Sequence, residues 1–266
     1  SEIAVKNIEN LVRKLDFDLY TYVIDWEEFR ELQRSFLQAS VIDIEMLTDH
    51  AIVAVLLNLA KKNKVNYIIT GSNKATEFIL PKSWVYSKLD ARNIRDIHKK
   101  FSTQKLKTFP FVSFVDWLKR ESMLGNPKFI KILNLVEYDK QKAKEILEKE
   151  LEWRDYGGKH YESIFTKFYQ AAILPEKFKI DKRRAHLSSL IVSGQITRAE
   201  ALQELKKPLY EPNEFSNDRE YCIKKLGYTL EEFNDILNLP VRSHSDYSNT
   251  TKIIKVLRTI KRKWKG

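Results

Sequence analysis

The chain has 266 residues, of which 43% are hydrophobic and 12% aromatic, and its formal net charge is +11. This hydrophobic content excludes an intrinsically disordered protein, and the length suits one large domain or two smaller ones. A single Cys excludes an internal disulfide framework and fits a reducing compartment, so we expect a cytoplasmic protein. No apolar run has the length of a membrane span, and no Cys/His spacing indicates zinc. The positive charge favours an anionic partner, such as a nucleotide, a nucleic acid or an anionic membrane surface.

The first residues predict a helix. Val5, Ile8, Leu11, Val12 and Leu15 form an apolar stripe at helical spacing. The sequence opens without Met and directly inside this helical pattern, so we expect the helix to follow another segment of protein.

A parallel α/β unit is predicted over about the first 75 residues. Residues 19–24 are typical of a buried strand that ends at Asp25, and residues 26–38 of a helix. A second helix is expected from Thr48 or Asp49, followed by a strand that stops at residues 71–73. Strand, helix and strand in this order are typical of a right-handed parallel crossover.

The second half is mostly helical from about Phe111. Capping boxes begin at Thr197 and Thr229, and Gly194 and Gly227 stand where helices are expected to end. The fold predicted is therefore α/β, with a partial Rossmann-like parallel sheet followed by a mostly helical domain. The expected ranges are 1–110 for the α/β domain, 111–241 for the helical domain, and 242–266 for a polar linker with a basic amphipathic helix.

One candidate site lies at the carboxyl edge of the predicted sheet, where open α/β sheets bind ligands. Gly71, Ser72 and Asn73 follow the second strand, and Asp49 and His50 begin the helix of the same unit. We expect these five residues to line one cleft. The alternative is that the first three form a simple turn and that Asp49 only caps its helix.

Two further polar groups follow. Glu77 could hold a metal or a ribose, although a lone Glu after a turn is usually solvated. Asn93, Asp96, His98 and Lys100 lie close together in the sequence, and a solvated helix face is the expected explanation.

A second candidate site lies between residues 156 and 191. The apolar positions of one expected helix there are Tyr161, Ile164, Phe165, Phe168, Tyr169 and Ala172. Lys159 and His160 would lie in its first turn, and a second helix would begin at Asp181 with Lys182, Arg183 and Arg184 next.

Cations are unfavourable at the positive end of a helix dipole. A bound phosphate would offset both the dipole and the repulsion between the cations. The alternative is that these side chains extend separately into solvent and form ion pairs with scattered carboxylates. The two histidines of the region, His160 and His186, together with nearby serines, also allow acid–base or nucleophilic catalysis, but no G-x-S-x-G context accompanies them.

Several segments together resemble the N-acetyl sugar amidotransferases of lipopolysaccharide O-antigen and nonulosonic-acid biosynthesis. The runs that carry the resemblance are TDHA (48–51), GSNKATE (71–77), LPKSW (80–84), KTFP (107–110), YGGKHYES (156–163), LPEKF (174–178), DKRRAHLSSLI (181–191) and SGQITRAEAL (193–202). The resemblance reaches to about residue 240, and the block from 156 to 202 is its most specific part.

The resemblance implies a fold similar to the PP-loop ATP pyrophosphatases. ATP with Mg²⁺ would adenylylate the carbonyl oxygen of an acetamido group on a nucleotide-linked N-acetyl sugar, and ammonia would then displace AMP. The implied partners are a glutaminase and a cyclase-like subunit that resemble subunits of histidine biosynthesis. No nucleic acid is expected as a partner.

The site residues expected from these arguments fall into three groups, with no residue expected to ligate a metal. They are Lys159, His160, Lys182 and Arg183 as catalytic residues; Asp49, His50, Gly71, Ser72, Asn73 and Glu77 as cofactor-binding residues; and Tyr161, Glu162, Arg184, His186 and Ser188 as substrate-binding residues.

The sequence also departs from the family pattern. Upstream of the part that matches, the family has a cysteine-rich stretch that suggests zinc, and an S-G-G-x-D-S phosphate loop. Neither occurs in residues 1–266, so we expect these residues alone to be inactive. The alternatives are a PP-loop tRNA-modifying or RNA-binding protein, and a non-catalytic scaffold. We expect the tail to pack on its own domain, and a weak membrane-surface contact is the alternative.

Overall fold

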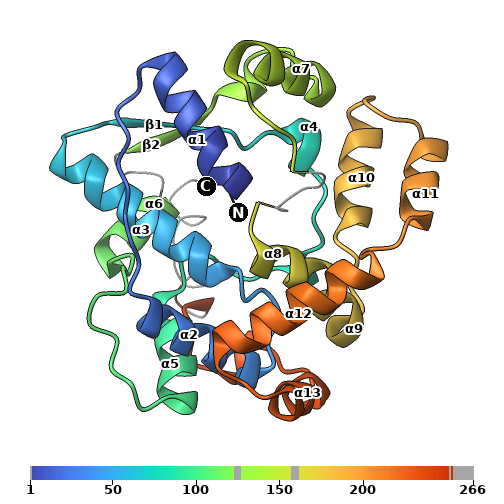
Figure 1. Ribbon diagram of the computed structural model, residues 1–266. Coiled ribbons are helices and arrows are strands. Elements are labelled where there is room, and N and C mark those ends of the chain that lie inside the picture. Colours follow the sequence, from blue (N-terminus) through green and yellow to red (C-terminus); the bar gives the residue numbers. More distant parts are fainter. Residues whose placement is uncertain (1, 123–126, 157–161, 252, 254–266) are drawn as a thin grey trace, which may run out of the picture. The chain divides into compact units, whose positions relative to one another are not determined.

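The computed structural model describes residues 2–122, 127–156, 162–251 and 253 (Figure 1). The chain divides into two compact units. Unit 1 comprises Ser1–Val23, Tyr67–Trp84 and Lys128–Leu230, and unit 2 comprises Ile24–Asn66, Val85–Pro127 and Glu231–Gly266. Each unit is assembled from three separated stretches, so the units divide the chain differently from the three consecutive ranges expected from the sequence.

Unit 1 contains both described strands and most of the short helices. Its elements are α1 (Glu2–Leu15), β1 (Tyr67–Thr70), α4 (Lys74–Glu77), η1 (Lys82–Trp84), β2 (Lys128–Lys131), η2 (Ile132–Asn134), α7 (Lys140–Leu151), α8 (Ile164–Phe168), η3 (Tyr169–Ile173), α9 (Leu174–Phe178), α10 (Arg183–Val192), α11 (Arg198–Lys206) and α12 (Pro212–Leu226).

The sheet of the described residues has two parallel strands, β1 and β2, with Tyr67 opposite Lys128 and Thr70 opposite Lys131 (Figure 1). The expected strand at β1 is therefore confirmed, and a parallel pair does form, but its partner is β2. The side chain of Ile69 is 68% exposed, which is unusual because parallel sheets are generally covered on both faces.

The strand predicted at residues 19–24 is wrong. These residues form no strand, and Leu19, Tyr20 and Val23 are exposed, Val23 to 84%. The apolar side chains of this stretch fit a strand locally, but strand formation depends on pairing and on burial of one face.

Helix α1 forms as predicted, but it packs in an unexpected way. Its buried residues are Asn7 and Asn10, whereas Val5, Ile8 and Leu15 are exposed. The amide of Asn7 donates to the carbonyl oxygen of Arg154 and accepts from its N–H, at 2.9 Å each. Hydrogen bonds between asparagine side chains and the backbone of residues after α7, rather than the apolar stripe, hold this helix in place.

A continuous helical segment runs from α8 through η3 to α9. Ser163 is its N-cap and accepts a hydrogen bond from the N–H of Thr166. The helix therefore begins at Ile164, later than predicted. Its middle turn, η3, is π-helical, and it contributes Tyr169, Ala172 and other buried side chains to the core of unit 1.

The caps that the sequence predicts around α10, α11 and α12 are largely present. Thr197 and Glu200 form the capping box of α11. Gly194 and Gly227 both adopt positive φ, at 74° and 70°, directly after α10 and at the end of α12. Helix α10 packs on α11 through Leu187, Leu190 and Ala201.

Unit 2 is helical in its described part. Its elements are α2 (Trp26–Ala39), α3 (Met46–Lys62), α5 (Ala91–Phe101), α6 (Phe114–Ser122), α13 (Leu230–Asn238, whose first residue falls in unit 1) and η4 (His244–Asp246). Helix α2 packs on α5. The start predicted for α3 at Thr48 or Asp49 is wrong, because the helix begins at Met46 after Glu45.

A buried carboxylate organises one loop of unit 2. Glu28 on α2 accepts hydrogen bonds from the backbone N–H groups of Lys107, Thr108 and Phe109, the shortest at 2.7 Å. Burial raises the pKa of this carboxyl, but the backbone hydrogen bonds outweigh that effect and lower it below the ordinary value. The KTFP run is thus held in place by Glu28.

Residues 242–251 are not a loose linker. His244 is buried, its ring stacks on Tyr86 at 3.9 Å between centroids, and its Nδ1 lies 2.7 Å from Oδ1 of Asn93. Thr250 donates to Asp90 from both its N–H and its hydroxyl. The sequence suggests a linker because the segment is polar, but several of its polar groups bind α5 and its N-cap Asp90.

The predicted solvated face of α5 is wrong for two of its four residues. Asn93 and His98 are buried, and His98 Nε2 lies 2.7 Å from the carbonyl oxygen of Gln104. Asp96 and Lys100 form an i,i+4 ion pair at 3.0 Å.

Candidate functional site

The clearest candidate site lies in unit 1, where α4 packs against α10. Two side chains of α10 and that of its C-cap residue Ser193 bind the backbone of α4 and of a residue after it. His186 Nδ1 lies 3.1 Å from the carbonyl oxygen of Thr76, and the hydroxyl of Ser193 donates to that of Ala75 at 3.0 Å. The hydroxyl of Ser189 accepts from the N–H of Ile79. The segments 71–77 and 181–191, which both carry the family resemblance, are therefore neighbours in space.

Asn73 explains why the short helix α4 forms. Its side-chain oxygen accepts from the N–H of Thr76 at 2.9 Å and from the Thr76 hydroxyl at 3.1 Å. This is the usual role of Asn at an N-cap. The N–H of Lys74 donates to Oδ1 of Asn134, which ties α4 to η2. A Cβ at Gly71 would meet no atom within 4 Å, so the described structure leaves open space there.

Lys140 and His186 form a hydrogen-bonded pair beside α4. Lys140 Nζ lies 3.2 Å from His186 Nε2. Because an ammonium can only donate, Nε2 must accept, and the ring is then neutral with its proton on Nδ1. That proton is donated to the Thr76 carbonyl oxygen. The backbone N–H of Lys140 is in turn held by Gln195 Oε1.

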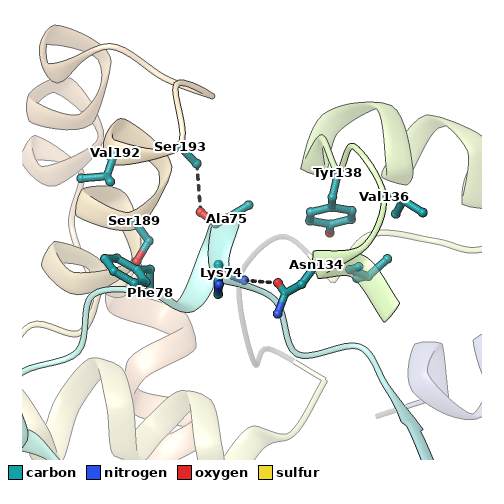
Figure 2. Close-up of a pocket in the computed structure, with 10 residues that line it drawn as sticks. Lys74, Ala75, Phe78, Asn134, Val136, Tyr138, Ser189, Val192 and Ser193 are labelled. Atoms are coloured by element: carbon teal, nitrogen blue, oxygen red, sulfur yellow. Dashed lines mark hydrogen bonds between the residues drawn. The ribbon is translucent and has the colours of Figure 1, made fainter. Parts of the chain in front are cut away.

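A hollow opens between α4, η2 and α10 (Figure 2). It has a volume of about 380 Å³. The residues that line it are Lys74, Ala75, Phe78, Leu133, Asn134, Val136, Tyr138, Ser189, Val192 and Ser193. Phe78 and Val192 lie on one side of α4, and Tyr138 and Val136 lie on its other side (Figure 2).

Tyr138 is an uncharged hydrogen-bond donor at ordinary pH. Burial raises the pKa of its phenol, and the carboxylates of Asp139 and Glu77 raise it further. Glu77 therefore contributes to the electrostatic field at the Tyr138 side of the site.

The cations at the start of α10 are arranged differently from the expected phosphate cluster. Helix α10 begins at Arg183, after Lys182. The guanidinium of Arg183 forms an ion pair with Asp181 at 2.8 Å and donates to the carbonyl oxygen of Lys207. Asp181 also accepts from the Arg183 N–H. Asp181 thus supplies the negative charge that this helix start favours. Arg184 is exposed, and Ser188 is half-buried.

Asp49 and His50, also expected at the site, belong to unit 2, whereas residues 71–73 belong to unit 1. His50 is fully buried: its Nε2 accepts from the N–H of Val112 at 3.0 Å, and its Nδ1 lies 2.8 Å from the carbonyl oxygen of Lys88. Asp49 forms an ion pair with Lys88 at 3.1 Å, and Lys88 also contacts the buried Asp43. Burial lowers the pKa of Lys88, but these two carboxylates raise it overall.

Three of the expected residues, Lys159, His160 and Tyr161, lie outside the described residues, as do the glycines before them and almost all of the tail. Glu162, next to them, is half-buried. Ile253 is described and packs against the unit 2 cluster of Ala54, Val112 and Trp117.

Sequence reasoning missed Lys140, Tyr138 and Lys74 as site residues. Two of them follow β2, a strand too short and too basic to stand out in the sequence. The signal that was available is Asp139, which caps α7 by accepting from the Lys142 N–H and thereby marks a helix start next to both residues.

Among the described residues, no helix combines the length and the apolar character needed to cross a membrane. No curated protein and no solved structure matches the chain significantly. Residues 162–261 match a family model described as the C-terminal domain of WbpG-like lipopolysaccharide (LPS) biosynthesis proteins. This segment, which includes α8 to α13, covers less than half of the chain, and it supports a place for the protein among LPS biosynthesis proteins.

Proposed function

We propose that the protein is the synthetase part of an ATP-dependent amidotransferase that converts an acetamido group of a nucleotide-linked sugar to an acetamidino group. The observation that carries this proposal is the packing of α4 on α10. It joins the segments 71–77 and 181–191, and the second of these lies inside the part that matches LPS biosynthesis proteins.

The proposed reaction has two steps. The acetamido oxygen attacks the α-phosphorus of ATP and releases pyrophosphate. Ammonia then adds to the activated carbon, and AMP leaves with the former acetamido oxygen. ATP thus supplies the leaving group. Ammonia would come from a glutaminase partner, with a cyclase-like subunit as a further partner.

The residues of the α4–α10 site suit the binding and proton-transfer parts of this reaction. His186 is held by the Thr76 carbonyl oxygen so that Nε2 carries the lone pair. An Nε2 in this state can accept a proton from the attacking nitrogen. Lys140, which occupies Nε2 in this structure, offers its ammonium to an anionic group once substrate is present.

The described residues hold no group of three or more His, Cys, Asp or Glu side chains placed to bind a metal ion. Mg²⁺ commonly binds through one or two carboxylates, substrate phosphates and waters. We therefore propose that Mg²⁺ arrives with the nucleotide, with Glu77 as the one expected cofactor-binding carboxylate at this site. The phosphate loop that the resemblance implies would hold the pyrophosphate.

The test is a coupled pyrophosphate assay with a diacetamido nucleotide-sugar, ATP and an ammonium salt. It is run on residues 1–266 and on a polypeptide in which an S-G-G-x-D-S segment precedes them. We expect AMP and pyrophosphate in step with amidination from the longer polypeptide only. Sustained turnover by residues 1–266 would contradict the role given to the loop, and ADP with phosphate would contradict adenylylation.

Variants of the longer polypeptide test the site itself. His186→Ala and Lys140→Met are each expected to lower kcat/KM by about 10²-fold, the usual contribution of a positioned proton-transfer group. Lys206→Met on the exposed end of α11 is the control and should leave kcat/KM unchanged.

A further inference from the structure

The hollow between α4, η2 and α10 has apolar walls that the described structure leaves open. Phe78 and Val192 are each 65% exposed, and Val136 is 55% exposed, although all three are large apolar side chains. Its volume of about 380 Å³ lies within the usual range for small-molecule sites. A ligand with an apolar face would remove this surface from water.

Two polar side-chain groups at the hollow make no hydrogen bond or ion pair within the described part of the chain. Among the described residues, the ammonium of Lys74 has neither an ion pair nor a hydrogen bond, and the hydroxyl of Tyr138 has no hydrogen-bond partner. The hydroxyls of Ser189 and Ser193, by contrast, are both used by the backbone. The hollow thus offers one cation, Lys74 on α4, and one neutral donor, Tyr138, together with apolar side chains.

We propose that this hollow binds a ring compound that carries a single phosphate. The apolar walls select a ring over a free phosphate ion. One uncommitted ammonium matches one phosphate rather than a polyphosphate. Sugar phosphates and nucleoside monophosphates share this chemistry.

The charges around the hollow set the orientation of the ligand. Glu77 and Asp139 act on the Tyr138 side, so an anion is repelled there. The phosphate is expected at Lys74, with the ring against the apolar side chains of the lining and its polar edge at the Tyr138 hydroxyl. This arrangement places the ligand against α4, the helix whose Thr76 carbonyl oxygen binds His186.

The test measures binding alone, by isothermal titration of residues 1–266 with AMP, UMP, N-acetylglucosamine 1-phosphate, adenosine and inorganic phosphate. At least one ring monophosphate is expected to bind at least about tenfold more tightly than inorganic phosphate and than adenosine. The proposal would be overturned if none of the three ring monophosphates binds, or if inorganic phosphate binds as tightly as they do. The comparison among the three tells a nucleotide ligand from a sugar ligand. Because no turnover is measured, the outcome is independent of the amidotransferase reaction.

Three variants in the hollow and two control variants locate the ligand that binds. Lys74→Gln should weaken binding by about tenfold and Tyr138→Phe by about fivefold. Val192→Trp should fill the hollow and abolish binding. Lys206→Gln and Leu202→Trp make the same changes at exposed positions of α11 and should leave the affinity as it is. The proposal is wrong if tight binding survives both Lys74→Gln and Val192→Trp, or if the control variants weaken it equally.

Discussion

Lys140 Nζ lies 3.2 Å from His186 Nε2, and this contact links the first residue of α7 to the middle of α10. The same imidazole uses its other nitrogen on the carbonyl oxygen of Thr76, at the end of α4. One neutral side chain therefore connects three helices of unit 1. Its removal leaves a half-buried ammonium and a carbonyl oxygen without this partner, which costs more than the loss of an ordinary surface contact.

We expect His186→Leu to lower the free energy of unfolding by about 1–2 kcal/mol, measured by urea unfolding. His186→Asn should cost less, because its amide can still donate to the Thr76 carbonyl oxygen. Ser188→Ala, on the same helix, is the control and should change stability by less than about 0.5 kcal/mol. Equal effects for the Leu and Asn variants would show that the hydrogen bond to Thr76 contributes nothing.

A second prediction concerns Glu28, which holds the loop at Lys107–Phe109 through four short N–H···O contacts. In Glu28→Gln one carboxylate oxygen becomes an NH₂ group that faces backbone donors. We expect a loss of about 2–4 kcal/mol in the free energy of unfolding, because buried donors lose a charged acceptor. Glu27→Gln, its exposed neighbour that pairs with Arg30, should cost less than about 0.5 kcal/mol. A small effect of Glu28→Gln would show that the loop does not depend on the charge.

Local sequence signals predicted those features that depend on residues close together in the sequence, such as helix caps and helix ranges. Asn73 is a helix cap, the capping box of Thr197 and Glu200 forms, and α2 lies within one residue of its expected range. The pairing of β1 with β2 could not be predicted in this way, because the partner strand lies some sixty residues later in the chain. Register and partner choice depend on contacts that no local pattern contains.

The candidate site shows the same division. The sequence singled out Asn73 and His186, and their segments meet in the structure. It missed Lys140, whose only mark in the sequence is its place after a capping Asp139. The cations after Asp181 suggested a phosphate site. The sequence alone does not show that Arg183 pairs with Asp181, because this contact depends on the conformation of the turn between them.

The third prediction follows from the inverted packing of α1, where Asn7 and Asn10 face the protein and Ile8 faces outward. Asn10 donates to the carbonyl oxygen of Glu152 at 3.0 Å, and Asn7 makes two hydrogen bonds with the backbone of Arg154. Asn7→Leu should therefore destabilise α1 by about 1–3 kcal/mol. Ile8→Ala should cost less than about 0.5 kcal/mol, in contrast with an ordinary amphipathic helix. Hydrogen exchange of the α1 amides measures both, and greater loss of protection in Ile8→Ala would show that the apolar stripe is the packed face.

The last prediction concerns the pH dependence of stability and rests on His50. Burial lowers the pKa of this imidazole to about 4 from its ordinary value near 6.5. The geometry gives the reason: Nε2 accepts from the N–H of Val112, and the opposite nitrogen donates to the carbonyl oxygen of Lys88. A second proton would break the first of these hydrogen bonds and place a charge in the core. Burial also lowers the pKa of His244 in the same unit.

Above pH 6.5 the His50 ring is neutral in both the folded and the unfolded chain, so its contribution to stability is complete there. As the pH falls from 6.5 towards 4, only the unfolded chain takes up the proton, and this group should cost about 1.4 kcal/mol of stability per pH unit, or about 3 kcal/mol in all. Guanidinium unfolding at pH 7.5, 6.5, 5.5 and 5.0 should show the decline before the carboxylates begin to titrate. His50→Gln should start from a lower stability and lose the part of the slope that comes from this ring. An NMR titration in which the His50 ring protonates near pH 6.5 would show that its environment is open to water and would remove the basis of the prediction.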